Sequence, residues 1–365
     1  MEILNNVSKN KAFQQFKKEE DKDFFNYKID KSLPNHTFVR RDVASDVPRQ
    51  GTDTQTIKFI LPKDGLLGKM LLKLEAVAGT VVFEDKAGIN MASEIRLCNP
   101  FGCFGKLYPE VLYQKIEELQ NDSQRSLMNT LYGDGNNPVC YAPLLFNFSD
   151  TVSGFLNCLH DTEYWVECDM VDTTSICSTH TNPVWRASLI AEYVVVPSSV
   201  EAQLVKQYPL AKSMTNYNRE KTVSASVGVN SVQLKHKGLC SRLYIAVKNT
   251  ADLDYQSITA VKLVNNGKTV VEFDNLVENQ FFSHNYVGVE SDVFGSSSSV
   301  IWSVNFDISS KKNGYRGGIY LNDNYNEDWR LDVTCAGAGD LLIMEEFYEL
   351  VRVDKKHGLM RVKAV

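Results

Sequence analysis

The sequence predicts an all-β protein made of two similar modules in tandem. Over most of its 365 residues, short runs of β-branched and aromatic residues alternate with turns containing Gly, Pro, Asn and Asp. The second half repeats landmarks of the first half in the same order. Between the halves, Pro197 ends the apolar run of residues 189–196, because proline has no amide hydrogen to donate to a sheet.

Composition and charge exclude several classes of protein. With 43% hydrophobic and 23% charged residues, most of the chain is expected to fold. The net charge is −6 and no block of Lys or Arg is present, so we expect no direct nucleic-acid binding. The longest apolar stretch, residues 66–83, contains Lys69, Lys73 and Glu75, so no segment is expected to span a bilayer.

Residues 1–50 predict an extended N-terminal arm rather than a domain. Their aliphatic and aromatic residues are scattered among charged ones and cannot form a sizeable core. No apolar signal core is present, which predicts synthesis in a cytoplasm. The eight cysteines are therefore expected to be reduced thiols, except that Cys98 and Cys103 flank a turn and allow a conditional disulfide.

Residues 51–197 form the first predicted module. Its expected strands are residues 55–61, 69–78, 80–84, 92–98, 141–148, 164–170 and 189–196. One helix interrupts them. It begins at Pro109, places Leu112, Tyr113 and Ile116 on one face, and continues to about residue 131 before Gly133.

Residues 198–214 form a predicted linker with a short helix at residues 200–206, capped by Ser198 or Ser199. Residues 215–365 form the second module and the C-terminal tail. Its expected strands are residues 221–229, 231–235, 241–248, 258–265, 268–273, 300–308, 329–334 and 341–353, with no long helix.

Three landmarks of the first module recur in the second. Ile95-Arg96-Leu97 matches Val261-Lys262-Leu263, residues 147–150 match residues 305–307, and Ala191-Glu192-Tyr193 matches Glu345-Glu346-Phe347. The shared order favours tandem duplication. Each copy then has about eight strands, which is the number in a jelly roll.

Several runs resemble strands of a known family. Pro143-Leu144-Leu145-Phe146-Asn147-Phe148 looks like its Pro-Leu-x-Phe-x-Phe strand, residues 191–194 look like its module-closing strand, and residues 238–247 resemble the strand that opens its second barrel. Residues 348–360 resemble its closing hairpin. The family is the double jelly-roll major capsid proteins of icosahedral DNA viruses, an adenovirus-type lineage, with the best match to nucleocytoplasmic large DNA viruses and their smaller relatives.

The resemblance implies a capsid protein of the virion that forms a pseudo-hexameric homotrimer. Three copies of two similar wedges can tile a near-hexagonal lattice. The implied partners are further copies of the chain in neighbouring trimers, minor capsid or penton proteins and, through the N-terminal arm, an internal membrane. The turn at residues 316–319 follows the family's Pro-Ser-Gly turn only loosely. A scaffold protein of the same fold, a two-jelly-roll carbohydrate-binding protein and a glycoamidase-type hydrolase are the alternatives.

A zinc site and an acid pair are the candidate chemical sites. Five potential zinc ligands lie close together in the sequence, but their spacings do not match paired zinc knuckles. They are Cys158, His160, Cys168, Cys177 and His180. For hydrolysis, Glu345 and Glu346 are adjacent on a strand and point to opposite faces, whereas Glu192 and Glu167 fit solvated strand faces equally well. We expect no catalytic residue, cofactor or metal.

The aromatic residues allow a core role or a sugar-binding role. Trp165, Trp302 and Trp329 lie in predicted strands beside apolar residues, which favours packing in the core. Tyr315, Tyr320 and Tyr325 lie in a predicted loop, which favours contact with another subunit or a receptor.

Overall fold

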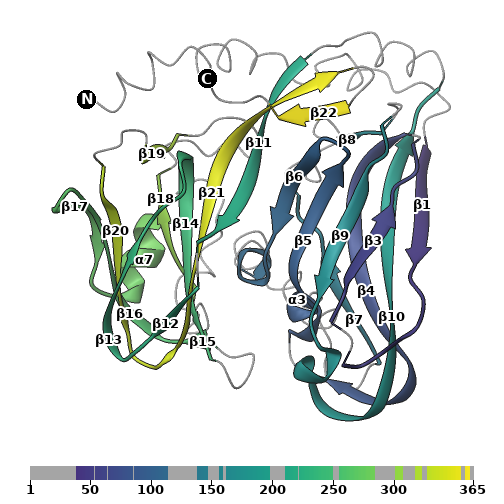
Figure 1. Ribbon diagram of the computed structural model, residues 1–365, viewed down its shortest axis with the longest axis horizontal. Coiled ribbons are helices and arrows are strands. Elements are labelled where there is room, and N and C mark those ends of the chain that lie inside the picture. The colour runs from purple at the N-terminus through teal and green to yellow at the C-terminus, as the bar shows by residue number, and fades with distance from the viewer. Residues whose placement is uncertain are drawn as a thin grey trace.

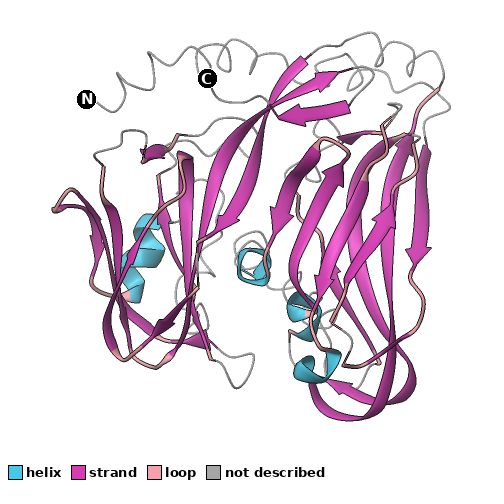
Figure 2. Ribbon diagram, in the orientation of Figure 1, coloured by secondary structure: helices cyan, strands magenta, loops and turns pink. Residues whose placement is uncertain are grey.

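Two β modules lie side by side along the longest axis of the computed structural model (Figure 1). The structure describes residues 38–52, 54–63, 65–84, 86–113, 138–146, 156–158, 162–197, 210–220, 222–249, 255–283, 301–306, 317–322, 327–354 and 358–361. Strands dominate both modules, and the few helices are short (Figure 2). The all-β prediction is therefore confirmed.

The first module consists of two antiparallel sheets. Its elements are β1 (Phe38–Ser45), β2 (Arg49–Gln50), β3 (Thr56–Ile60), β4 (Leu66–Phe83), α3 (Ala87–Asn90), β5 (Ala92–Asn99), β6 (Gly102–Leu107), β7 (Val139–Pro143), β8 (Leu156–Asn157), β9 (Trp165–Met170), η3 (Thr173–Ile176) and β10 (Cys177–Val195). One sheet has the strand order β1-β10-β4-β7, with β2 beside β10 and β8 beside β4. The other has the order β3-β9-β5-β6.

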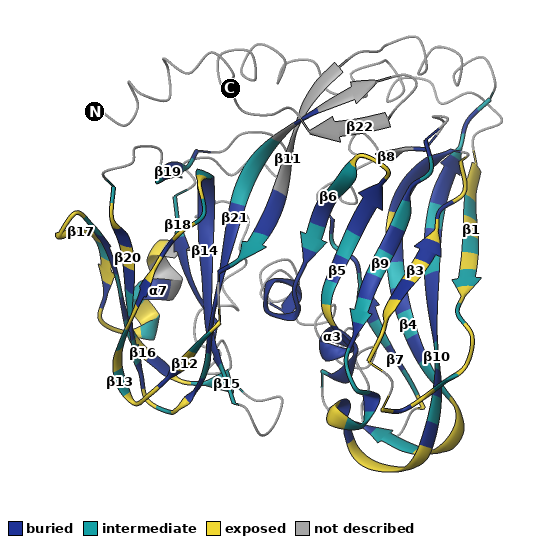
Figure 3. Cartoon of the chain, in the orientation of Figure 1, coloured by how far each residue is buried: buried dark blue, intermediate teal, exposed yellow. Residues whose placement is uncertain are grey.

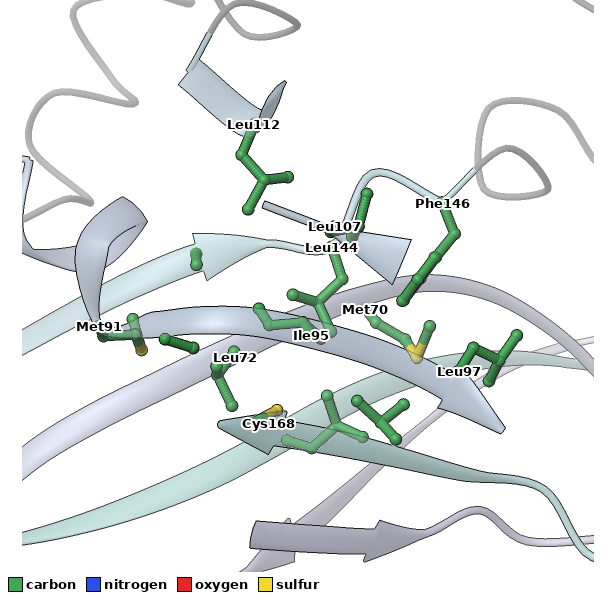
Figure 4. Close-up of a cluster of buried hydrophobic side chains, with 14 of the residues drawn as sticks. Met70, Leu72, Met91, Ile95, Leu97, Leu107, Leu112, Leu144, Phe146 and Cys168 are labelled. Carbon is green, nitrogen blue, oxygen red and sulfur yellow. The ribbon is translucent and has the colours of Figure 1, made fainter. Parts of the chain in front are cut away.

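The core of this module lies between its sheets. On β9, Val166, Cys168 and Met170 are buried, while the residues between them are half-buried on the outer face. This alternation follows from the two-residue period of a strand. Figure 4 shows Cys168 of β9 in one cluster with Leu72 of β4 from the opposite sheet. The two sheets therefore bury one continuous apolar layer.

The second module has the same plan. Its elements are β11 (Leu210–Arg219), β12 (Val223–Ala225), β13 (Gly228–Gln233), β14 (Gly238–Lys248), β15 (Tyr255–Gln256), β16 (Ile258–Asn265), β17 (Lys268–Phe273), α7 (Leu276–Ser283), β18 (Trp302–Asn305), β19 (Ile319–Leu321), β20 (Trp329–Cys335), β21 (Gly339–Asp354) and β22 (Gly358–Arg361). One sheet has the order β11-β21-β14-β15, with β12 and β22 beside β21 and with β18 and β19 beside β14. The other has the order β13-β20-β16-β17.

The strand orders confirm that two of the three sequence landmarks are equivalent. Ile95-Arg96-Leu97 lies on β5 and Val261-Lys262-Leu263 on β16, each the third strand of a four-stranded sheet. Residues 191–193 lie on β10 and residues 345–347 on β21, each the second strand of its sheet path. The remaining landmark falls on residues 147–150, outside the described residues. Topology therefore agrees with the repeat that the sequence indicated.

The predicted arm is corrected at its C-terminal end. Residues 1–37 lie outside the described residues, but β1 pairs along β10 from Phe38 opposite Val195 to Ser45 opposite Ser188. The strand was missed because its centre, Arg40-Arg41-Asp42, is charged. An edge strand tolerates such residues because one side faces solvent. The first module therefore includes residues 38–45, which precede its predicted start at residue 51.

The predicted linker is corrected in the same way. Its helix falls on residues 200–206, outside the described residues, whereas residues 210–214 already belong to β11. β11 pairs with β21 from Leu210 opposite Val353 to Arg219 opposite Met344. Polar residues such as Asn216 and Asn218 hid this strand in the sequence.

Other elements differ from expectation in extent. The two predicted strands at residues 69–78 and 80–84 form one strand, β4, which continues through Gly79. Gly79 has φ +84° opposite a register shift in β10, a conformation that glycine adopts without strain. Strand β6 and helix α7 were not predicted. The predicted helix at Pro109 is present at residues 109–113, and its remainder lies outside the described residues. None of the described helices has the length and apolar character needed to cross a bilayer.

Candidate functional site

The surface where the two modules meet is the first candidate site. Buried side chains of the second module belong to the same apolar cluster as the core of the first. They are Tyr217, Tyr244, Ala246, Ile301, Leu342, Met344 and Val351. On β21 the alternation divides the two roles: Leu342 and Met344 face the first module, whereas Leu341 and Ile343 face the core of the second. Figure 3 shows β11, the partner strand of β21, next to β6 across this junction.

An ion pair crosses the junction, with its carboxylate buried and its guanidinium half-buried. Arg219 at the end of β11 donates from Nη2 to Oε2 of Glu110 at 2.7 Å. Glu110 lies in the helical segment after β6, and its side chain is only 2% exposed. The Arg219 guanidinium also lies 4.3 Å from the centre of the Tyr108 ring. The pair therefore joins a charge of the second module to a buried charge of the first.

Hydrogen bonds extend this connection. The Lys106 amide donates to Asn216 Oδ1 at 3.0 Å, and Lys248 Nζ donates to Asn90 Oδ1 at 3.2 Å. Burial lowers the pKa of Lys248, while Glu110 acts in the opposite direction. These contacts join β6 and α3 of the first module to β11 and β14 of the second, so the two modules are held as one unit.

Glu345 and Glu346 confirm the prediction that they point to opposite faces, and both are buried. Glu346 accepts hydrogen bonds from Tyr244 Oη at 2.9 Å, Ser241 Oγ at 3.1 Å and Tyr217 Oη at 3.3 Å. The two tyrosines belong to the cluster at the junction. Glu346 therefore fixes side chains between the modules, and its hydrogen bonds explain how a carboxylate is buried there.

Glu345 lies on the second module's side of β21. It accepts a hydrogen bond from Asn218 Nδ2 at 3.1 Å and interacts with Glu220. Glu220 accepts hydrogen bonds from the amides of Lys235 and His236 at 2.6 and 2.8 Å. Burial, and then the neighbouring Glu220, raise the pKa of Glu345 to about 8. At neutral pH Glu345 is thus mainly protonated.

The zinc candidate does not form in the described residues. Cys158, Cys168 and Cys177 are buried in the apolar cluster, His180 is exposed on β10, and His160 lies outside the described residues. Burial raises the pKa of Cys177 to about 11 and that of Cys168 still further, so both are neutral thiols at pH 7. These cysteines pack as apolar residues.

Glu192 and Glu167 are also separated. Glu192 lies on β10 and pairs with Arg41 at 3.5 Å, whereas Glu167 lies on β9 in the other sheet and accepts a hydrogen bond from Arg96 at 3.3 Å. They do not face a common cleft. Each carboxylate forms an ion pair with an arginine of a neighbouring strand in its own sheet.

The aromatic predictions are confirmed for two of the three tryptophans. Trp302 and Trp329 are buried in the second core, but Trp165 is half-buried on the outer face of β9. There its ring lies under Lys58 Nζ at 3.7 Å. Tyr320 lies in β19 opposite Leu239, so it is part of a strand rather than a loop. Tyr315 and Tyr325 lie outside the described residues.

The cysteines agree with the expectation, including the one disulfide that it allowed. Cys98 and Cys103 form a disulfide across the turn between β5 and β6, whereas the other six cysteines are free and buried. The two residues are direct partners in the antiparallel register, which brings their sulfurs together. In the sequence, the only sign of this disulfide was that the two cysteines flank a turn.

These observations define a double jelly-roll protein whose two modules share a packed junction. Comparison with solved structures agrees. The structure of PBCV-1 VP54, fitted into a reconstruction of the virophage Sputnik, is 11% identical, has a TM-score of 0.69, and covers 91% of this chain and 99% of that one. The Faustovirus major capsid protein is 8% identical and has a TM-score of 0.63, and the match covers 91% of this chain and 92% of that one. The mavirus major capsid protein is 9% identical and has a TM-score of 0.51, and the match covers 92% of this chain and 91% of that one.

At this level of identity the likeness establishes the fold, which is the double jelly roll. No protein-family model matches the sequence, and no curated protein does.

Proposed function

We propose that this chain is the major capsid protein of an icosahedral DNA virus and assembles as homotrimers with a pseudo-hexagonal outline. The likeness to capsid structures over about nine-tenths of both chains carries the proposal. The likeness covers both jelly rolls of the chain, and not one module alone. Because a lattice tile must keep its shape, the packed junction between the modules supports the same role.

Exposed apolar side chains at the two ends of the molecule support self-association. The first group lies on and just after β1, at one end of the long axis, and the second lies on β13, β17 and α7, at the other end (Figure 1). The first contains Phe38, Val39, Val43 and Val47, and the second contains Val229, Val270, Val277 and Phe282. Contact between unlike ends of successive copies is heterologous, and such contacts close into a ring when the rotation permits.

The mass of the purified chain tests the trimer. We expect mass photometry to give a species of three chains that persists on dilution, and electron microscopy to show a near-hexagonal outline. A monomer at high concentration, with no ordered particles, would contradict the proposal.

Replacing Val43 by glutamate, or Val277 by glutamate, is expected to raise the concentration at which the trimer half-dissociates by about tenfold or more, because a charge would be buried at the contact. Sedimentation velocity over a dilution series measures this change. Phe101→Ser is the matched control, because Phe101 is an exposed apolar residue on the turn between β5 and β6, away from both ends. If all three variants dissociated at the same concentration, the two ends of the molecule would not form the interface.

The proposal extends to location and partners. The protein would be part of the virion, synthesised in the host cytoplasm, and would contact minor capsid or penton proteins, with residues 1–37 available for an internal membrane. A net charge of −6 without a basic block supports a role that does not bind nucleic acid directly. The proposed role is structural rather than enzymatic. The similar solved structures are capsid proteins, and Glu345 and Glu346, the pair considered for hydrolysis, face different sides of their strand.

A further inference from the structure

Two cysteines and a carboxylate come together beside the turn between β5 and β6 of the first module, with Cys98 buried and the other two half-buried. Cys98 is the second-last residue of β5, Cys103 is the second residue of β6, and Glu167 lies on β9, the strand on the other side of β5. One ligand atom from each lies within 4.8 Å of the other two. The distance from Cys98 Sγ to Glu167 Oε2 is 4.0 Å. These three residues form the one cluster with metal-ligand chemistry that the described ranges contain.

We propose that, when the Cys98–Cys103 disulfide is reduced, the two thiolates and the Glu167 carboxylate bind one Zn²⁺ ion. Thiolate sulfur and carboxylate oxygen are zinc ligands, and four residues between the cysteines is the upper end of the spacing in zinc knuckles. In a tetrahedral zinc site, sulfurs lie about 3.8 Å apart, given Zn–S bonds of about 2.3 Å. Breaking the disulfide allows the sulfurs to reach this separation by side-chain rotation.

Glu167 is oriented for this role. Trp165 Nε1 donates to Glu167 Oε1 at 2.7 Å, which leaves Oε2 directed at the sulfurs. A partner that fixes a ligating carboxylate in this way strengthens metal binding. Arg96 is a competing cation, since its Nε lies 3.3 Å from Oε2. However, Arg96 also donates twice to Asp169, at 2.7 and 2.9 Å, and these bonds can hold it when Oε2 turns to a metal.

The second module shows that the hairpin does not need its cysteines. The equivalent turn between β16 and β17 contains Asn266-Gly267 and closes without a cysteine. In the first module, Asn99 Oδ1 accepts the Phe101 amide at 2.8 Å, which stabilises the turn independently of the sulfurs. The cysteine pair therefore adds a chemical property to a turn that would form anyway.

The reaction is balanced with a small thiol as the reductant. Two thiol molecules supply two electrons and two protons, the Cys98–Cys103 bond breaks, and one small-molecule disulfide forms. Zinc binding then releases the two thiol protons. Cys103 is half-buried and Phe101 beside it is exposed, so the reductant can approach from solvent.

Metal titration of the full-length chain tests the site. Protein reduced with a phosphine is freed of reductant under nitrogen and titrated with Co²⁺, then with Zn²⁺. We expect a thiolate-to-cobalt absorption band, displacement of that cobalt by zinc, and one zinc per chain by mass spectrometry. The oxidised protein is expected to show neither the band nor bound zinc.

Variants separate this site from other thiols. Cys98→Ser with Cys103→Ser is expected to abolish the band, and Glu167→Gln to weaken zinc binding at least about tenfold. Cys335→Ser, which changes a buried cysteine on β20 of the second module, is the matched control and is expected to retain the band. Circular dichroism checks folding of each variant. Equal zinc binding by reduced wild type and by the double serine variant would overturn the proposal.

Discussion

Replacing Arg219 by methionine is expected to lower the free energy of unfolding by about 3–5 kcal/mol. Methionine keeps much of the apolar contact with Tyr108 but removes the cation that is hydrogen-bonded to the buried Glu110 carboxylate, which then has only the more distant Lys248 nearby. Removing this partner is costly because the remaining carboxylate is shielded from water and loses its hydrogen-bonded counter-charge. Urea unfolding at pH 7 and constant protein concentration, followed by tryptophan fluorescence, measures the loss.

Two further variants show whether the cost arises from the isolated charge. Combining Arg219→Met with Glu110→Gln is expected to recover a large part of the stability, because the uncompensated carboxylate is removed. Lys262→Met is the matched control on the exposed pair of Lys262 with Glu272, and should cost about 0–1 kcal/mol. If Arg219→Met were as mild as Lys262→Met, the pair would not stabilise the junction.

Stability that depends on Glu345 is expected to fall as pH rises. Its pKa in the folded protein is about 8, above the ordinary value of 4.5, so the folded state holds a proton that the unfolded state has released. The stability that Glu345 contributes is fully present below about pH 4.5, declines between pH 4.5 and 8, and is lost above pH 8. The total loss in the free energy of unfolding is expected to be a few kcal/mol. Thermal unfolding across this range measures it.

Glu345→Gln is expected to remove this dependence. Glutamine keeps an oxygen for Asn218 and supplies an N–H to Glu220, so at pH 9 the variant should be more stable than wild type, and near pH 4.5 about equally stable. Burial also lowers the pKa of His236, so stability falls below about pH 6.5, where the unfolded state binds this proton more readily. This loss is expected in both proteins, so it cancels when their stabilities are subtracted. Glu192→Gln, at a surface pair, is the control and should keep the wild-type profile. Parallel profiles for wild type and Glu345→Gln would show that Glu345 is not the protonated group.

Much of the fold followed from local patterns. The alternation of residues 165–170 predicted β9, and a similar two-residue period predicted β20. Strand β14 followed instead from a continuous apolar run, because it is buried on both faces. The opposite orientations of Glu345 and Glu346 followed from the two-residue period. Strands β1 and β11 escaped prediction because their residues are charged or polar, and their pairing partners are distant in the sequence.

By itself, the sequence determined that the chain forms strands, that the two halves share one plan, and which residues alternate toward a core. The tertiary structure alone decided that Arg219 meets Glu110, that Glu345 lies against Glu220, and that Cys98, Cys103 and Glu167 surround one point. The physical reason is that periodicity acts between neighbours along the chain, whereas burial, ion pairing and ligand geometry depend on which distant strands become neighbours in the sheets.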